Sequence, residues 1–141
     1  MSEYLVERIK ASGHPNVSAR HKTTLEVTGD NYLTPTGDCI VAINADRCFP
    51  EFSPGFLDLL KSEGSRVEVL IECNGVRDKV TARGDKALTL NHGSEMVVRK
   101  SSYVCGRTLA VKADKAAADL KRELVDELKR GNEVIVELRV Y

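Results

Sequence analysis

Two segments of the chain concentrate side chains that bind ligands or transfer protons. The first, residues 13–28, contains the candidate ligand-binding residues His14, Asn16, Arg20 and His21. Imidazole titrates near neutral pH, and amide and guanidinium groups give directed hydrogen bonds. This density of polar groups is typical of a ligand site, and the alternative is a hairpin with a solvated polar face.

The second segment carries the candidate ligand-binding residues Arg99, Lys100, Ser101 and Arg107. Cations beside hydroxyl groups resemble an anion cradle, because arginine makes bidentate hydrogen bonds with phosphate or carboxylate. The alternative is a strand end that leaves its charges in water.

The distribution of charge links the two segments. The 141 residues include 21 basic and 21 acidic groups, yet no acid lies between Glu7 and Glu26 or between Glu95 and Asp114. If these acid-free stretches meet after folding, they form a basic patch that favours a small anion. Zero net charge argues against bulk polyanion binding, and aromatic residues that could stack on single-stranded nucleic acid are only 5% of the chain.

These observations predict that a small phosphate- or carboxylate-bearing ligand binds at a basic, histidine-containing cleft. The alternatives are an RNA-associated protein that uses the same patch and a structural subunit of a homo-oligomer. Whether the protein is an enzyme stays open, because dinucleotide-binding, P-loop, zinc-protease and serine-hydrolase motifs are missing. No catalytic residue is predicted. The four cysteines form no CxxC pair, so no metal site or cofactor is predicted.

The elements that position these residues are predicted from hydrophobic periodicity and turn signals. Strands are expected near 4–11, 19–28, 39–43, 87–90, 95–99 and 107–112, and helices near 54–63 and 115–130. Ser53 and Asp114 are the expected N-caps. The predicted fold is α+β, with a mainly antiparallel sheet or partly closed β-barrel and two packed helices. We expect one domain over residues 1–141 and no internal repeat.

Asn74-Gly75 predicts the tightest connection, a two-residue type I′ hairpin that pairs Cys73 with Val76. The strict alternation of valine and leucine from Val134 to Val140 predicts a final strand. As a terminal strand it is a candidate for edge pairing with a second copy through Val136, Leu138 and Val140.

No apolar stretch is long enough for a transmembrane helix, and the first residues carry charge where a signal peptide has an apolar run. The expected location is therefore the cytoplasm.

Three strings, GHPNVSARHKTTLEVTGD, LTPTGDCIVAINAD and VVRKSSYVCGRTLAVKADKAAADL, carry a resemblance across nearly the whole chain. They resemble a family of small archaeal proteins, domain-of-unknown-function family three hundred and seventy-one. The resemblance implies a cytosolic, single-domain archaeal protein, and it implies no activity or catalytic residue.

Overall fold

Eight strands form two four-stranded sheets in the computed structural model, which describes residues 3–141. The first sheet has the fully antiparallel order β1-β8-β4-β5, and the second has the order β3-β2-β6-β7 with parallel outer pairs. The elements are β1 (Leu5–Ser12), β2 (Thr24–Thr28), β3 (Ile40–Ala42), η1 (Phe49–Glu51), α1 (Pro54–Leu60), β4 (Arg66–Cys73), β5 (Val76–Arg83), β6 (Glu95–Arg99), β7 (Thr108–Ala110), η2 (Ala117–Asp119), α2 (Arg122–Lys129) and β8 (Glu133–Val140). The α+β class and mainly antiparallel pairing are confirmed, and over the described residues the sheets do not close into a barrel.

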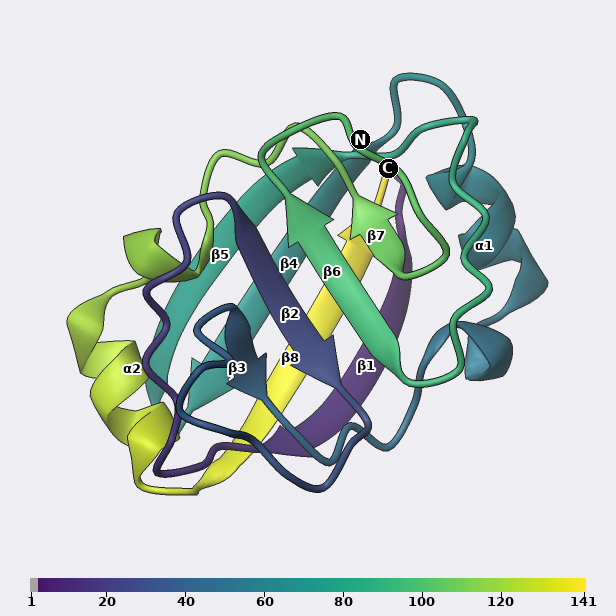
Figure 1. The fold of residues 1–141 in the computed structure, drawn as a ribbon. Helices are drawn as coiled ribbons and strands as arrows, with labels where there is room; N and C mark the ends of the chain where they lie inside the picture. Colours follow the sequence, from purple (N-terminus) through teal and green to yellow (C-terminus); the bar gives the residue numbers. More distant parts are fainter. Residues whose placement is uncertain (1–2) are drawn as a thin grey trace.

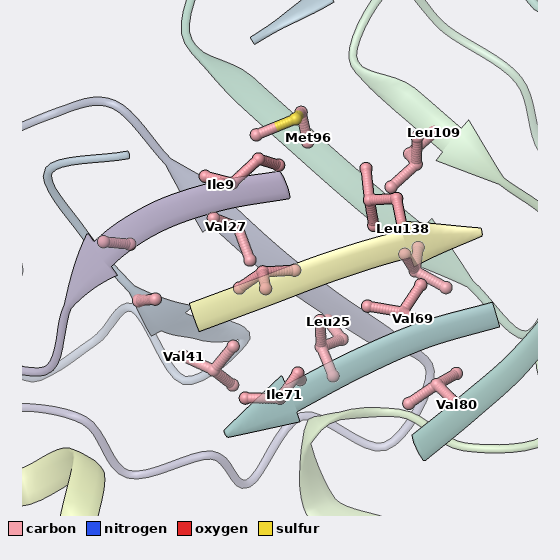
Figure 2. Packing of buried hydrophobic residues seen from close by; sticks show 14 of the residues in the cluster. Ile9, Leu25, Val27, Val41, Val69, Ile71, Val80, Met96, Leu109 and Leu138 are labelled. Atoms are coloured by element: carbon pink, nitrogen blue, oxygen red, sulfur yellow. The ribbon is translucent and has the colours of Figure 1, made fainter. Parts of the chain in front are cut away.

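The core lies between the two sheets, which pack face to face with α1 and α2 on opposite sides (Figure 1). Alternate residues of each strand point inward, so Leu25 and Val27 of β2 approach Val69 of β4 and Leu138 of β8 (Figure 2). The residual void between the two inner faces is only about 10 Å³. This close packing fixes the register of every core strand, because a slip of one residue would turn the apolar side chains outward.

The β4–β5 hairpin confirms the predicted turn and register. Asn74 and Gly75 have φ values of 49° and 82°, as a type I′ turn requires, and Cys73 pairs with Val76. Asp78 breaks the otherwise apolar inner row of β5, and it is nevertheless buried. A buried carboxylate needs charged or hydrogen-bonding partners, and the partners of Asp78 belong to the candidate site.

The first helix begins as predicted, because the Ser53 side chain accepts the N–H of Phe56 and Pro54 occupies the first turn. The prediction that the second helix begins at 115 is wrong. The α-helix starts at Arg122, after the separate single turn η2. Asp114 caps no helix, because its Oδ1 accepts the N–H of Thr81 at 2.9 Å and ties the segment to β5.

Two predicted strand stretches are also absent from the described residues. β2 begins at Thr24 rather than residue 19, and residues 87–90 form no strand. Ala19 and Leu90 both have φ of 50°. This left-handed conformation is incompatible with an extended strand, and apolar composition alone could not reveal it.

The prediction that the last strand is a free edge is wrong. β8 lies between β1 and β4 and pairs with both along its length. Val136, Leu138 and Val140 are buried in the core. Both sides of the β8 backbone are thus already hydrogen-bonded, and a second copy cannot pair there without displacing a neighbour.

The prediction of no internal repeat is also wrong. The same order of elements occurs twice, from β1 to β4 and from β5 to β8: three strands, a 3₁₀ turn, an α-helix and a fourth strand. In each copy an aspartate after the third strand fastens the first strand. Asp46 Oδ1 accepts the N–H of Lys10 and Asp114 Oδ1 that of Thr81, both at 2.9 Å. Further equivalent pairs are His21 and His92, Asn44 and Lys112, and Gly13 and Gly84.

The two copies are interleaved rather than side by side. In the first sheet, strands of the first copy (β1 and β4) alternate with strands of the second (β8 and β5). In the second sheet, β2 of the first copy pairs with β6 of the second at the centre. Positions on the equivalent strands can therefore be compared between the two copies.

Candidate functional site

The predicted histidines hold turns together. His14 Nδ1 accepts the N–H of Asn16 at 2.9 Å. His21 Nδ1 accepts the N–H of Thr24 at 3.1 Å, and His92 Nδ1 makes the equivalent bond with Glu95 at 2.9 Å. In this arrangement the Nδ1 atoms accept from the backbone, so His14 and His21 have local structural roles.

The remaining predicted residues of the first segment have separate surroundings. The Asn16 side chain donates to the carbonyl of Leu33 at 2.7 Å. Arg20 is exposed, and its backbone N–H donates to the carbonyl of Asp38 at 3.0 Å. Neither residue contacts His14 or His21 through its side chain in these bonds.

The two predicted segments do meet, because β2 pairs with β6 and Lys100 N–H donates to the carbonyl of Thr23. Their cations, however, are taken up by other groups. Lys100 Nζ lies 2.7 Å from Asp119, and Arg107 lies 2.8 Å from Glu95. Ser101 is exposed and its hydroxyl accepts the N–H of Tyr103.

The eight predicted residues therefore have largely separate hydrogen-bond and ion-pair partners. None of them lines the 620 Å³ groove described next or either of two smaller cavities. The neighbouring carboxylates neutralise much of the expected basic patch.

A groove of about 620 Å³ lies instead over the outer face of the first sheet. Its volume is in the range typical of small-molecule sites. Cations outnumber acids in its lining, which consists of Arg8, Arg77, Lys79, Lys115, Lys121 and Arg139, of Glu72, Asp78, Asp114 and Glu137, and of Leu70, Ile71 and Ile135. The sheet supplies most of these residues because its outward-facing positions alternate with the core positions.

Ion pairs occupy part of the groove. Arg77 pairs with Glu72 at 2.9 Å and Arg139 with Glu137 at 2.6 Å. Lys79 is exposed, and its ion pair with Glu68 is long, at 3.6 Å, and therefore weak. Thus the groove retains positive charge that its own acids do not fully match.

Asp78 organises the end of the groove at the β5 edge. Its two oxygens accept the N–H groups of Lys79 at 2.8 Å and Lys121 at 2.9 Å, and the Lys115 ammonium at 2.6 Å. Burial would raise the pKa of Asp78, but Lys115 and these two N–H groups hold it below the usual value of 3.8. The carboxylate therefore fixes the backbone of Lys79 and Lys121 while leaving their ammonium groups in the groove.

A second polar centre lies on the outer face of the second sheet. Glu26 of β2, only 5% exposed, hydrogen-bonds Glu95 of β6. Its Oε1 also lies 3.7 Å from Arg107 and 3.8 Å from the Cys39 thiol. Burial and the negative charge of Glu95 raise the pKa of Glu26 from 4.5 to about 7, although Arg107 opposes them.

Cys105 lies beside this centre. Its sulfur is 3.4 Å from Arg99 Nη2 and 3.7 Å from the Thr108 hydroxyl, and the Arg107 backbone also favours its thiolate form. Burial alone would raise the pKa of Cys105, but these donors lower it from 9.0 to about 7. In Cys39, Cys48 and Cys73 burial raises the thiol pKa, so only Cys105 among the four has substantial thiolate character near neutral pH.

Comparison with known proteins places the chain in a family. The family model described as "Domain of unknown function (DUF371)" matches residues 9–141. The chain belongs to the DUF371 family. An uncharacterized protein of Methanocaldococcus jannaschii, MJ0206, is 49% identical over 132 residues, which cover 94% of this chain and 97% of that protein. The resemblance predicted from the three sequence strings is thereby confirmed.

Within residues 3–141 of this DUF371 protein, no three His, Cys, Asp or Glu side chains gather in a way that could hold a metal ion. None of the helices described here is long and apolar enough to cross a membrane.

None of the residues of the groove was predicted as a site residue, and of the second centre only Arg99 and Arg107 were predicted. The groove lysines lie on β5 and on the segment before α2, and nothing in the sequence shows that these meet. Glu26 lay within the polar segment 13–28 and at the end of one acid-free stretch, and Glu95 stood out only as the start of the other stretch. The internal repeat was the signal that could have found Glu26. Residues 40–46 and 108–114 share Ala-x-x-Ala-Asp at equivalent positions, and aligning the two copies from this motif places Glu26 opposite Val97.

Proposed function

We propose that this DUF371 protein binds a small anionic ligand with an apolar body in the groove over the first sheet. The proposal keeps the ligand class predicted from the sequence and moves the site. The observation that carries it is a groove of about 620 Å³ in which six cationic side chains face four acidic ones.

The anionic group of the ligand is best placed at the β5 edge. Lys121 is exposed and makes no ion pair with any residue from 3 to 141, and Lys79 has only its weak contact with Glu68. Asp78 holds the backbone of both lysines, so part of the entropic cost of arranging two cations is met before the ligand arrives. Two ammonium groups on a fixed backbone suit a phosphate or carboxylate.

The apolar body of the ligand is best placed over Leu70 and Ile135. These side chains are half-buried on β4 and β8, and they form an apolar strip within the charged lining. Burying apolar ligand surface against them contributes affinity that inorganic phosphate alone cannot gain. We therefore expect an aryl or acyl anion to bind more tightly than the bare ion.

Titration calorimetry with phenyl phosphate and with inorganic phosphate at low salt tests the proposal. Phenyl phosphate is expected to bind more tightly, and Lys79→Gln/Lys121→Gln is expected to lower its affinity by about ten-fold or more. The matched control is Lys61→Gln/Lys86→Gln, which removes the same charge from two exposed lysines outside the groove. Absence of binding at millimolar phenyl phosphate, or an equal loss in both double variants, would contradict the proposal.

A further inference from the structure

The two copies of the repeat differ at the polar centre on the second sheet. The strands β2 and β6 lie side by side (Figure 1). Glu26 is equivalent to Val97, since each is the third residue of its strand and the two are paired. Cys39 is equivalent to Arg107, since their carbonyls accept the N–H groups of Glu26 and Val97. A repeat conserves what the fold needs twice, so a charged cluster present once requires another explanation.

The buried carboxylates illustrate this difference. Glu7 and Asp78 are equivalent, and each has a structural role, because it accepts a backbone N–H at the start of a helix and pairs with a cation. Glu26 is as deeply buried, at 5% exposed, yet no backbone N–H within residues 3–141 donates to it. Its partners are all titratable or charged side chains, namely Glu95, Arg107 and Cys39. Glu26 thus lacks the structural role of the other two.

Arg107 connects the acids of this centre. Its guanidinium lies 2.8 Å from Glu95 and 3.7 Å from Glu26, and the Cys105 thiol contributes to the raised pKa of Arg107. Three acidic groups therefore surround Arg107, with Arg99 as the second cation. The centre is electrically neutral when the three acids together retain one proton, and that proton can be held by the carboxyl pair while the sulfur is a thiolate.

Arg99 supplies a cation whose side chain has no carboxylate partner among the described residues. Its Nε donates to Thr108 at 3.0 Å and its Nη2 lies 3.4 Å from Cys105, with no carboxylate partner within residues 3–141. Its guanidinium lies over the Tyr103 ring, 4.9 Å from the centroid, and that ring is 62% exposed. An anionic molecule that approaches the sulfur thus meets a fixed cation and an exposed aromatic face.

We propose that Cys105, Arg107 and Glu26 form a thiol–acid reactive site, with Arg99 as the positioning cation, for small anionic disulfides. The site lies on the second sheet and is independent of the groove on the first. In the reaction the Cys105 thiolate attacks one sulfur of the disulfide. A new S–S bond forms to Cys105, the original S–S bond breaks, and the departing thiolate takes a proton from water, while Glu26 acts through its contact with Arg107.

The test compares two probes on the full chain: dithiobis(nitrobenzoate), a disulfide with two carboxylates, and dithiodipyridine, which is neutral. Rates are followed by absorbance with limiting reagent, and the modified cysteine is located by peptide mass spectrometry. The ratio of the rate with the anionic probe to the rate with the neutral probe is compared with that of a free cysteine whose amino and carboxyl groups are blocked. For Cys105 this ratio is expected to be at least about five-fold higher. Arg99→Gln should abolish this preference, and Arg66→Gln, on the first sheet, should retain it.

Glu26→Gln gives a second readout that a merely structural role would not move. Above about pH 7 the ionised Glu26 carboxylate competes with the Cys105 thiolate for Arg107, and a glutamine side chain does not, so the pH–rate profile of Glu26→Gln should reach its plateau at a lower pH. Circular dichroism establishes that each variant is folded. The proposal is overturned if another cysteine reacts first, if the anionic preference survives Arg99→Gln, or if the profile of folded Glu26→Gln does not move.

Discussion

Glu26→Gln also gives the sharpest test of the structure itself, through the pH dependence of stability. The pKa of Glu26 rises from 4.5 to about 7 on folding. Because one pKa unit corresponds to about 1.4 kcal/mol, this difference lowers the free energy of unfolding by about 3 kcal/mol once the pH exceeds 7. The Gln side chain does not ionise, and the variant escapes this penalty.

The sign follows from which state binds the proton. Below pH 4.5 Glu26 is protonated in both states and contributes no pH dependence. Between pH 4.5 and 7 the unfolded chain releases the proton while the folded chain keeps it, so stability falls as the pH rises. The free energy of unfolding of Glu26→Gln, minus that of the wild type, should therefore increase by about 3 kcal/mol from about pH 4 to about pH 8.

Urea denaturation at a series of pH values measures this difference. Glu72→Gln is the matched control, because Glu72 is a half-buried carboxylate in a surface ion pair with Arg77, and its curve should run parallel to that of the wild type. If the Glu26→Gln and wild-type curves also run parallel across this pH range, Glu26 does not hold a proton in the folded state and the described centre is incorrect.

Two further predictions concern the repeat. A Cβ atom at Gly13 would overlap the Leu128 carbonyl, and one at Gly84 would overlap the equivalent Leu60 carbonyl; Gly13→Ala and Gly84→Ala should each cost about 2 kcal/mol or more in urea denaturation. Gly93, which has open space around it, should tolerate alanine within about 0.5 kcal/mol, and equal effects at all three positions would argue against the packing. Because strands of the two copies alternate in the first sheet, calorimetry should record one cooperative unfolding transition, as expected for a single domain; two separable transitions would show that the copies unfold independently.

Local signals account for the parts of the fold that could be predicted. Asn74-Gly75 specifies its own turn, and the alternating residues on either side then fix the hairpin register. Ser53-Pro54 marks the start of α1 in the same way. These elements depend on neighbours along the chain, so a single sequence contains enough information to place them.

The sheet order could not be predicted, because it depends on residues far apart in sequence. β1 pairs with β8 and β2 with β6, and no local pattern distinguishes these partners from others. Asp114 shows the same limit on a smaller scale. It has the residue type of an N-cap, but its carboxylate is used by Thr81 of a distant strand.

The candidate site was predicted in part for the same reason. Arg99 and Arg107 do belong to a polar centre, but the acid-free stretches gave the wrong picture of their surroundings. Glu26 and Glu95 each border one acid-free stretch, and folding places Arg107 against both of these acids. The distance along the chain to the nearest carboxylate therefore says little about the charge that an arginine meets across a sheet.

The central position of β8 has a consequence for synthesis on the ribosome. β8 is the last strand of the sequence, and it separates β1 from β4 in the first sheet. While the protein is being translated, β1 and β4 have no partner on those edges until β8 emerges. Since such long-range pairing is slow and leaves hydrophobic edges exposed, nascent chains that stall before β8 should be the species that chaperones bind or that aggregate.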